Sequence, residues 1–176
     1  MRGRGRAAAV RTLAENVDAF ERRGYRVTAR SDFERRLEAP HALPLRLAMT
    51  SEGRIFGGSF ALEVASAEPL LPRTRGLSAR GRGVVRLRHV AFRPRSGDEE
   101  GARLAQRLTG DRALQRALGA VHFERIRVEA DGRPVIRHMG GSVVWVLFPP
   151  VVRPVPLPED QVGALVAAVE AFGASG

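Results

Sequence analysis

The segment from Val121 to Phe148 constrains the fold most, because it reads as strand, turn, strand, turn, strand. Its three runs, VHFERIRVEA, PVIRHM and VVWVLF, are separated only by the short connections DGR and GGS. Gly-containing connections of this length join antiparallel neighbours. The segment therefore predicts a β-meander. Its last strand is apolar on both faces, which predicts a place in the middle of a sheet covered on both sides.

Helix signals lie before and after this segment. Leu13, Val17 and Phe20 recur at helical spacing, and Gly24 is placed to end that helix. Further helices are expected where acidic caps and glycine stops bracket apolar residues at helical spacing: 98–110, 111–119 and 158–173.

Strand signals fill most of the remaining chain. Alternation of apolar and polar residues predicts strands at 25–30 and 84–94 and a β-hairpin over 44–66. Residues 31–40 fit either a short helix or a strand, residues 68–83 read as a loop, and the proline-rich residues 149–158 read as an extended connector. The expected fold is α+β, a mainly antiparallel sheet of about six or seven strands with N-terminal, middle and C-terminal helices packed on it.

The length of 176 residues suits one domain. We expect a flexible basic N-terminal arm at 1–10 and a single α+β domain at 11–176. The apolar run after the basic start is too short for a secretory signal, and no apolar stretch reaches the ~20 residues of a spanning helix. These features predict a cytoplasmic protein with no membrane partner.

Two residue types are missing from the chain. There is no cysteine, and all 29 basic residues are arginine, so lysine is absent too. Disulfides, thiolate nucleophiles, Cys-based zinc or iron–sulfur sites, Schiff-base lysines and P-loop lysines are thereby excluded. Arginine in place of every lysine is typical of a bacterial genome rich in G and C.

The triplet Gly-Gly-Ser occurs twice, at 57–59 and 140–142. A phosphate-binding loop needs a helix N-terminus behind it, but apolar strand-like runs follow both triplets. Neither Ser59 nor Ser142 has a glycine two residues later, so the nucleophile-elbow pattern fails as well. We interpret the first triplet as a bulge or kink in a strand, and the second as a hairpin turn that uses positive φ.

Catalytic patterns are weak. The spacing of the four histidines gives no local metal site, and the residues suggest no cofactor. His122 and His138 fall on neighbouring predicted strands with Glu124 nearby, and a pocket lined by His122, His138 and Trp145 remains open as an alternative. No catalytic residue is assigned, and the chain is expected to act by binding.

Charge gives the main functional prediction. The chain has a net charge of +10, and residues 73–95 contain eight arginines and no carboxylate: Arg73, Arg75, Arg80, Arg82, Arg86, Arg88, Arg93 and Arg95. Arginine forks pair with phosphate, so these residues are the predicted polyanion-binding site, with nucleic acid as the expected partner. The alternatives are a solvated basic face whose arginines pair with acids such as Asp98, and a module that binds a protein partner or assembles into a homo-oligomer.

Overall fold

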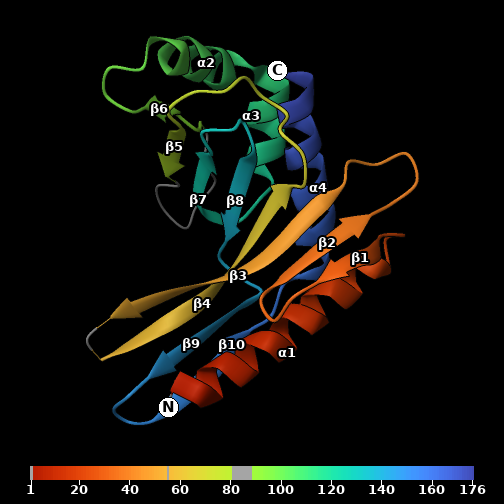
Figure 1. Cartoon of the computed structure of the whole chain (residues 1–176), viewed down its shortest axis with the longest axis vertical. Coiled ribbons are helices and arrows are strands. Elements are labelled where there is room, and N and C mark those ends of the chain that lie inside the picture. Colours follow the sequence, from red (N-terminus) through yellow and green to blue (C-terminus); the bar gives the residue numbers. More distant parts are fainter. Residues whose placement is uncertain (1, 55, 81–88) are drawn as a thin grey trace.

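The computed structural model describes residues 2–54, 56–80 and 89–176, which form four helices and a ten-stranded antiparallel sheet (Figure 1). The helices are α1 (Arg2–Glu21), α2 (Glu99–Gly110), α3 (Arg112–Gly119) and α4 (Glu159–Ala174). The strands are β1 (Arg26–Arg30), β2 (Glu34–Glu38), β3 (Leu45–Arg54), β4 (Gly57–Ser66), β5 (Leu77–Arg80), β6 (Arg93–Pro94), β7 (Phe123–Val128), β8 (Pro134–His138), β9 (Ser142–Val146) and β10 (Val151–Val155). The predicted α+β class is confirmed.

The sheet has more strands than the six or seven expected. The additional strands are β2, β5 and β10, in segments that the sequence left open or read as a loop and a connector. Each is short and polar or proline-containing, so its own alternation is weak, and its strand conformation depends on pairing with a neighbour. Residues 84–88 of the expected strand at 84–94 lie outside the described residues. In its described part the prediction is wrong for 89–92, which form no strand, and correct for Arg93–Pro94, which form β6.

Residues 2–10, expected to be a flexible arm, form the first half of α1. Ala7, Ala8 and Ala9 are strong helix formers, and Ala8 and Ala9 are buried against the rest of the protein. The second half of α1 is helical as the spacing of its apolar residues predicts, and Leu13 and Phe20 are fully buried.

Two antiparallel hairpins follow α1. The first joins β1 to β2 and resolves the ambiguity of residues 31–40 in favour of a strand. The second joins β3 to β4 with unbroken register from Leu45 opposite Ser66 to Arg54 opposite Gly57, which confirms the predicted hairpin.

Strand β4 is where the sheet divides. One edge of β4 pairs with β3, and its other edge pairs with two strands placed end to end. Residues Glu63–Ala65 pair with β8, while Gly57–Phe60 pair with β9. The predicted meander is thus correct for β7 and β8 but wrong for β9, which lies between β4 and β10. Strand β10 continues this branch through the proline-rich segment, and its position beyond β9 suits a strand with a proline.

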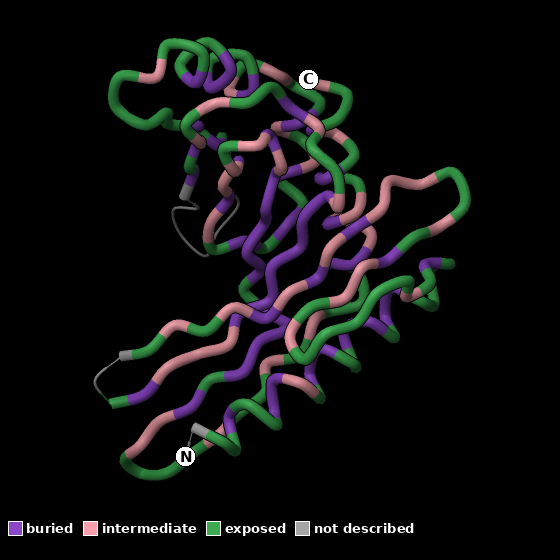
Figure 2. The backbone as a smooth tube through the Cα atoms, in the orientation of Figure 1, coloured by how far each residue is buried: buried purple, intermediate pink, exposed green. Residues whose placement is uncertain are grey.

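The helices pack on one face of the sheet. Leu47, Leu62 and Ile136 point toward this face and belong to a continuous buried core. Figure 2 shows the buried stretches of the backbone in purple. Alternate residues of the same strands, among them Arg46 and Glu63, point to the opposite face. In β9 the face opposite α1 is uncovered, and Val144 is exposed there, so the expected cover on both sides is absent.

Candidate functional site

Part of the Arg-rich segment, residues 73–95, lies in the sheet. Strand β5 pairs with both β7 and β6, which places the two described ends of the segment at the sheet edge beyond β7. Arg82, Arg86 and Arg88 lie outside the described residues, and the side chain of Arg80 is likewise not described. Arg73, Arg75, Arg93 and Arg95 are described and exposed.

A cavity of about 520 Å³ brings three of these arginines together. We call its exposed arginines, Arg75, Arg93 and Arg95, the rim, and the half-buried Arg125 and Arg127 of β7 the floor; Glu129 also lines the cavity. The cavity lies on the open face of the sheet, because Ser78 and Arg93 are register partners and Ser78 is opposite Arg127. We call the cavity lined by these five residues the arginine groove.

Rim cations of the arginine groove have no acidic partner. Within the described residues, no carboxylate lies within 4.0 Å of the guanidinium groups of Arg75, Arg93 or Arg95. Asp98 is close in space but has another role, because its Oδ1 accepts from Gly101 N at 2.9 Å and so caps α2. Its Oδ2 accepts from the backbone N of Arg75 at 2.7 Å, which fixes the Arg75 backbone and leaves the guanidinium free.

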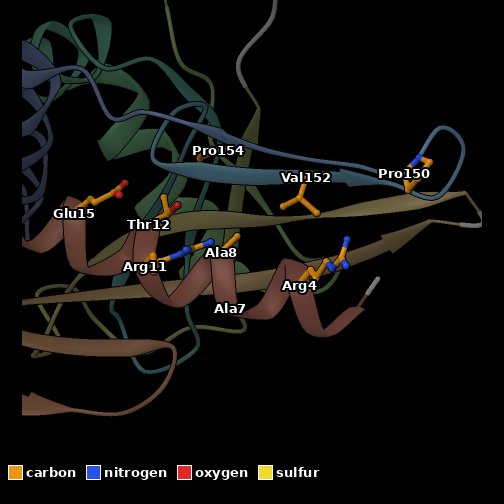
Figure 3. Close-up of a pocket in the computed structure, with 9 residues that line it drawn as sticks. All are labelled: Arg4, Ala7, Ala8, Arg11, Thr12, Glu15, Pro150, Val152 and Pro154. Carbon is orange, nitrogen blue, oxygen red and sulfur yellow. The ribbon is translucent and has the colours of Figure 1, made fainter.

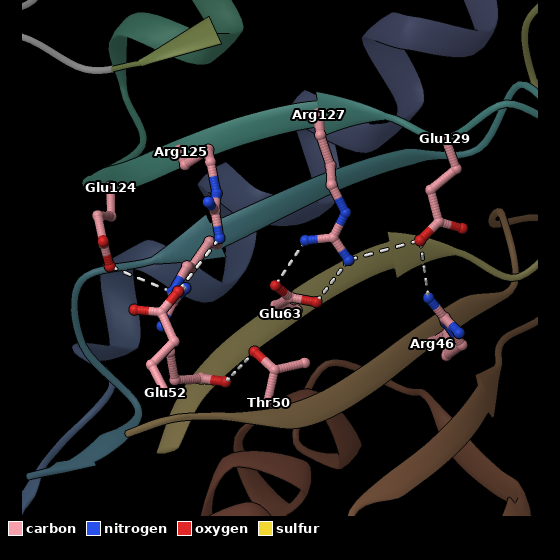
Figure 4. A network of polar contacts seen from close by, with 10 residues as sticks. Arg46, Thr50, Glu52, Glu63, Glu124, Arg125, Arg127 and Glu129 are labelled. Carbon is pink, nitrogen blue, oxygen red and sulfur yellow. Dashed lines mark hydrogen bonds and ion pairs between the residues drawn. The ribbon is translucent and has the colours of Figure 1, made fainter. Parts of the chain in front are cut away.

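The floor of the groove is paired in a fixed geometry (Figure 4). Arg127 donates two hydrogen bonds to Glu63, at 2.6 and 2.8 Å, and lies 3.4 Å from Glu129. The hydrogen bonds from Arg127 to Glu63 raise the pKa of this guanidinium. Burial would raise the pKa of Glu63, but the hydrogen bonds and charge of Arg127 outweigh it, so the pKa of Glu63 is lowered. Both groups are therefore charged at neutral pH.

A second part of the network lies beside this pair. Glu52 bonds to Arg125 at 3.4 Å and also to Arg137, whose side chain is only 2% exposed. Glu124, expected near the histidines, lies 3.2 Å from Arg137 Nε instead. The positive charges of Arg125, Arg127 and Arg137 are thus balanced by neighbouring glutamates. The rim arginines have no such carboxylate within 4.0 Å among the described residues.

His122, which precedes β7, and His138, the last residue of β8, approach each other at Gln161 of α4. The Oε1 of Gln161 accepts from the backbone N of His122 at 2.8 Å and lies 3.3 Å from His138 Nε2. His138 Nδ1 accepts from Gly140 N at 2.9 Å, so Nε2 carries the proton and donates to Gln161. Burial lowers the pKa of His138, which keeps the ring neutral. His138 is thus a buried, hydrogen-bonded ring in the core.

Trp145 is not part of a pocket with these histidines. It lines a separate cavity of about 390 Å³ with Phe33 and Phe60, near Arg6 and Glu52. Neither His122 nor His138 lines this cavity with Trp145. Among the described residues there is also no group of three or more His, Asp or Glu that could hold a metal ion.

A further groove lies between α1 and β10 (Figure 3). Its volume is about 480 Å³, with Arg4 and Arg11 on the α1 wall and Pro150 and Val152 on the β10 wall. The sequence did not single out these residues, because the two walls are more than 130 positions apart in the chain.

Comparison with known proteins establishes the family. Residues 18–175 match the family described as "Protein of unknown function (DUF3156)". The chain belongs to the DUF3156 family. The matched range contains every strand of the sheet and all five residues of the arginine groove in this DUF3156 chain, and it begins within α1. No curated protein and no solved structure matches the chain. Within the described residues, no helix is long and apolar enough to cross a membrane.

The floor arginines of the groove were missed by sequence reasoning. Arg125 and Arg127 lie 30 or more positions beyond the Arg-rich segment, within the run FERIRV. Their alternation with Ile126 and Val128 was the available signal, since it places both guanidinium groups on the face opposite the core.

Proposed function

We propose that this protein binds a polyanion, with duplex nucleic acid as the favoured partner, through the arginine groove. The observation that supports this proposal is the convergence on one cavity of Arg75, Arg93 and Arg95, none of which lies within 4.0 Å of a carboxylate in the described part of the chain. Unpaired guanidinium groups at a shared concave surface create a positive potential that attracts phosphate. Each phosphate that they neutralise also releases counterions, which favours binding.

The paired floor supports the same proposal through preorganisation. Arg127 is held by Glu63 in a bidentate pair and Arg125 by Glu52, so neither side chain needs to be ordered when a ligand arrives. Their remaining N–H donors stay at the cavity, while the rim arginines supply the net charge. Arginine rather than lysine suits this task, because its planar fork can make two parallel bonds to one phosphate.

The absence of an available aromatic side chain indicates backbone rather than base recognition. Phe92 is the only aromatic residue between positions 73 and 95, and it is buried with its ring 5.9 Å from that of Phe172. Single-stranded nucleic acids are typically held by stacking on exposed aromatic rings. A groove with five arginines and no aromatic residue in its lining suits the densely charged backbone of a duplex, read without base specificity.

Fluorescence anisotropy with labelled duplex DNA, duplex RNA and single-stranded DNA tests the proposal over ~50–300 mM salt. Duplex binding should weaken steeply as salt rises. The triple variant R75A/R93A/R95A should reduce the slope of log K against log salt by about one unit for each lost phosphate contact. A matched control, R103A/R107A/R112A, removes the same charge from exposed positions on α2 and α3.

The control separates the groove from net charge. If the control variant loses as much affinity as the groove variant, the site is not the arginine groove and the attraction is diffuse. If the unmodified protein binds no duplex at the lowest salt, the polyanion proposal is wrong. The rim arginines would then be tested as a contact for an acidic protein partner.

A further inference from the structure

Large apolar side chains are exposed at the end of the molecule opposite the C-terminus. Phe56 is 70% exposed at the β3–β4 turn, and Phe148 is 82% exposed after β9. Val144 and Val151 of the same branch are 42% and 44% exposed. The two turns and the N-terminus of α1 lie at this one end (Figure 1). We call these four side chains the apolar tip. Exposed apolar clusters of this kind mark interaction surfaces.

The two turns of the apolar tip are joined by backbone pairing. Gly57 is opposite Val146 in the β4–β9 ladder, and the backbone N of Leu147 donates to the carbonyl oxygen of Phe56 at 2.9 Å. Phe56 and Phe148 therefore project from neighbouring positions on one paired scaffold. Two side chains held in this way can enter a partner together without a large ordering cost.

Positive charge surrounds the apolar tip. The segments that build this end, residues 3–11, 56–62 and 139–157, contain four arginines and no carboxylate: Arg4, Arg6, Arg11 and Arg153. Arg6 pairs with Asp32 at 2.8 Å, but within the described residues no carboxylate lies within 4.0 Å of Arg4, Arg11 or Arg153. The 480 Å³ groove that Arg4 and Arg11 line also includes Pro150 and Glu15, and Arg4 and Pro150 lie toward one end of it while Glu15 lies at the other (Figure 3). Pro150 is two positions from Phe148, so the end of the groove that holds Arg4 is the end next to the apolar tip.

We propose that the apolar tip docks on an anionic lipid surface. Phe56 and Phe148 enter the boundary between headgroups and acyl chains, while Arg4 and Arg11 bind lipid phosphate in the groove beside them. Charge complementarity favours a lipid surface, since an interface rich in negative headgroups matches exposed aromatic side chains at the same end as Arg4, Arg11 and Arg153, which have no carboxylate of the described residues within 4.0 Å. Surface docking needs no spanning helix, and this site lies apart from the arginine groove and is independent of the function proposed above.

Co-sedimentation with phosphatidylcholine vesicles, with and without phosphatidylglycerol, tests this surface. The protein should partition onto the vesicles that contain phosphatidylglycerol. The variant F56S/F148S should reduce partitioning about tenfold or more, because two large apolar side chains no longer leave water. The variant R4Q/R11Q should reduce partitioning onto the anionic vesicles by about tenfold as well. Each arginine near the surface contributes about one kcal/mol, which corresponds to a few-fold in partitioning. The control R103Q/R107Q removes equal charge from α2 and should change partitioning little.

A spectroscopic readout confirms insertion directly. In the variant Phe148→Trp, the added indole should shift its emission to the blue when anionic vesicles are present, while the buried Trp145 of the unmodified protein should not. Equal partitioning of F56S/F148S and the unmodified protein would overturn the proposal. The proposal would also be wrong if the unmodified protein bound no vesicles. If F56S/F148S then sedimented differently from the unmodified protein in solution, the tip would be a contact between copies of this chain. Duplex affinity should be unaffected by either tip variant, so failure here leaves the arginine groove untouched.

Discussion

Glu63 shows how this sheet retains a buried charge. Its side chain is 4% exposed, and burial by itself would raise its pKa, yet Arg127 reverses the direction with two hydrogen bonds. A carboxyl whose pKa is lowered by folding stabilises the native state above its ordinary pKa of about 4.3. That contribution is lost as the pH falls through the lowered pKa, so this pair adds to acid sensitivity below about pH 4.

The substitution Glu63→Gln should lower the free energy of unfolding at pH 7 by about 1–3 kcal/mol. The change replaces the carboxylate by a neutral amide, so that among the described residues the 3.4 Å contact to Glu129 is the only ion pair left to Arg127. The effect is moderated because Arg127 is 31% exposed. The difference from the unmodified protein should shrink as the pH falls below about 4, when Glu63 itself takes up a proton. Urea unfolding followed by Trp145 fluorescence at several pH values measures it.

Glu68→Gln is the matched control for this prediction. Glu68 also pairs with an arginine, Arg36, at 2.7 Å, but it is 57% exposed, so its loss should cost less than ~1 kcal/mol. If the two substitutions cost the same at pH 7, burial does not decide the value of these pairs and the argument for Glu63 is wrong.

Individual residues also show where sequence reasoning stops. The charge of residues 73–95 could be predicted from the sequence, because charge is a property of composition. Which arginines remain unpaired could not, since Asp98 is used as a helix cap and the glutamates of the open face come from β3 and β4. The proximity of His122 and His138 was predicted, but their shared partner Gln161 lies on α4, far along the chain.

The two Gly-Gly-Ser elements serve the backbone, as the sequence indicated, but by different means from those expected for the first. Gly58 lies in a regular part of the β3–β4 ladder, with no bulge in the register. A Cβ built on Gly58 would lie 2.7 Å from the Trp145 ring and 2.5 Å from the carbonyl oxygen of Glu52. Gly141 does adopt the expected positive φ, at +67°, but the expected hairpin turn is wrong, because the strands that this connection joins, β8 and β9, do not pair with each other.

The substitution Gly58→Ala should therefore destabilise the protein by about 1–3 kcal/mol, because the added methyl group displaces Trp145 or the β3 backbone. Gly53 is its register partner across the hairpin, and a Cβ built there has nothing within 4 Å. Gly53→Ala should change stability by less than about 0.5 kcal/mol. Thermal unfolding of both variants, together with the emission maximum of Trp145, checks the pair. Equal losses of stability would contradict the close-packing explanation.

At the level of strands, the sequence predicted local hairpins better than it predicted which distant strands pair. The β3–β4 and β7–β8 hairpins follow from alternation and short turns, so the sequence predicted them. The position of β9 did not follow, because β4 is long enough to accept β8 along one part and β9 along another. Residues 149–158 were read as a connector because their five prolines weaken the strand signal. Strand β10 contains one of these prolines, Pro154, and its edge position tolerates it.

Strand β4 joins the two halves of the whole molecule. One half contains β8, β7, β5 and β6, and the other contains β9 and β10 with the apolar tip. The buried core is continuous through both, from Leu13 of α1 through Leu62 of β4 to Leu114 of α3. The arginine groove and the apolar tip thus lie on one scaffold, although they belong to different halves of it.

A continuous core and a shared central strand predict one cooperative unfolding transition. Trp145 is the only tryptophan and lies in the β9 half, so its fluorescence reports on that half. Far-UV circular dichroism is dominated by the helices, and three of the four described helices, α2, α3 and α4, lie beyond the other half. The two signals should give the same urea midpoint and the same m-value, as expected of a two-state domain. The variant Gly58→Ala, placed in the β9 half, should shift both midpoints together. A Trp145 transition that precedes the loss of helix, or a Gly58→Ala shift confined to fluorescence, would show that the tip half unfolds on its own and that β4 does not couple the halves.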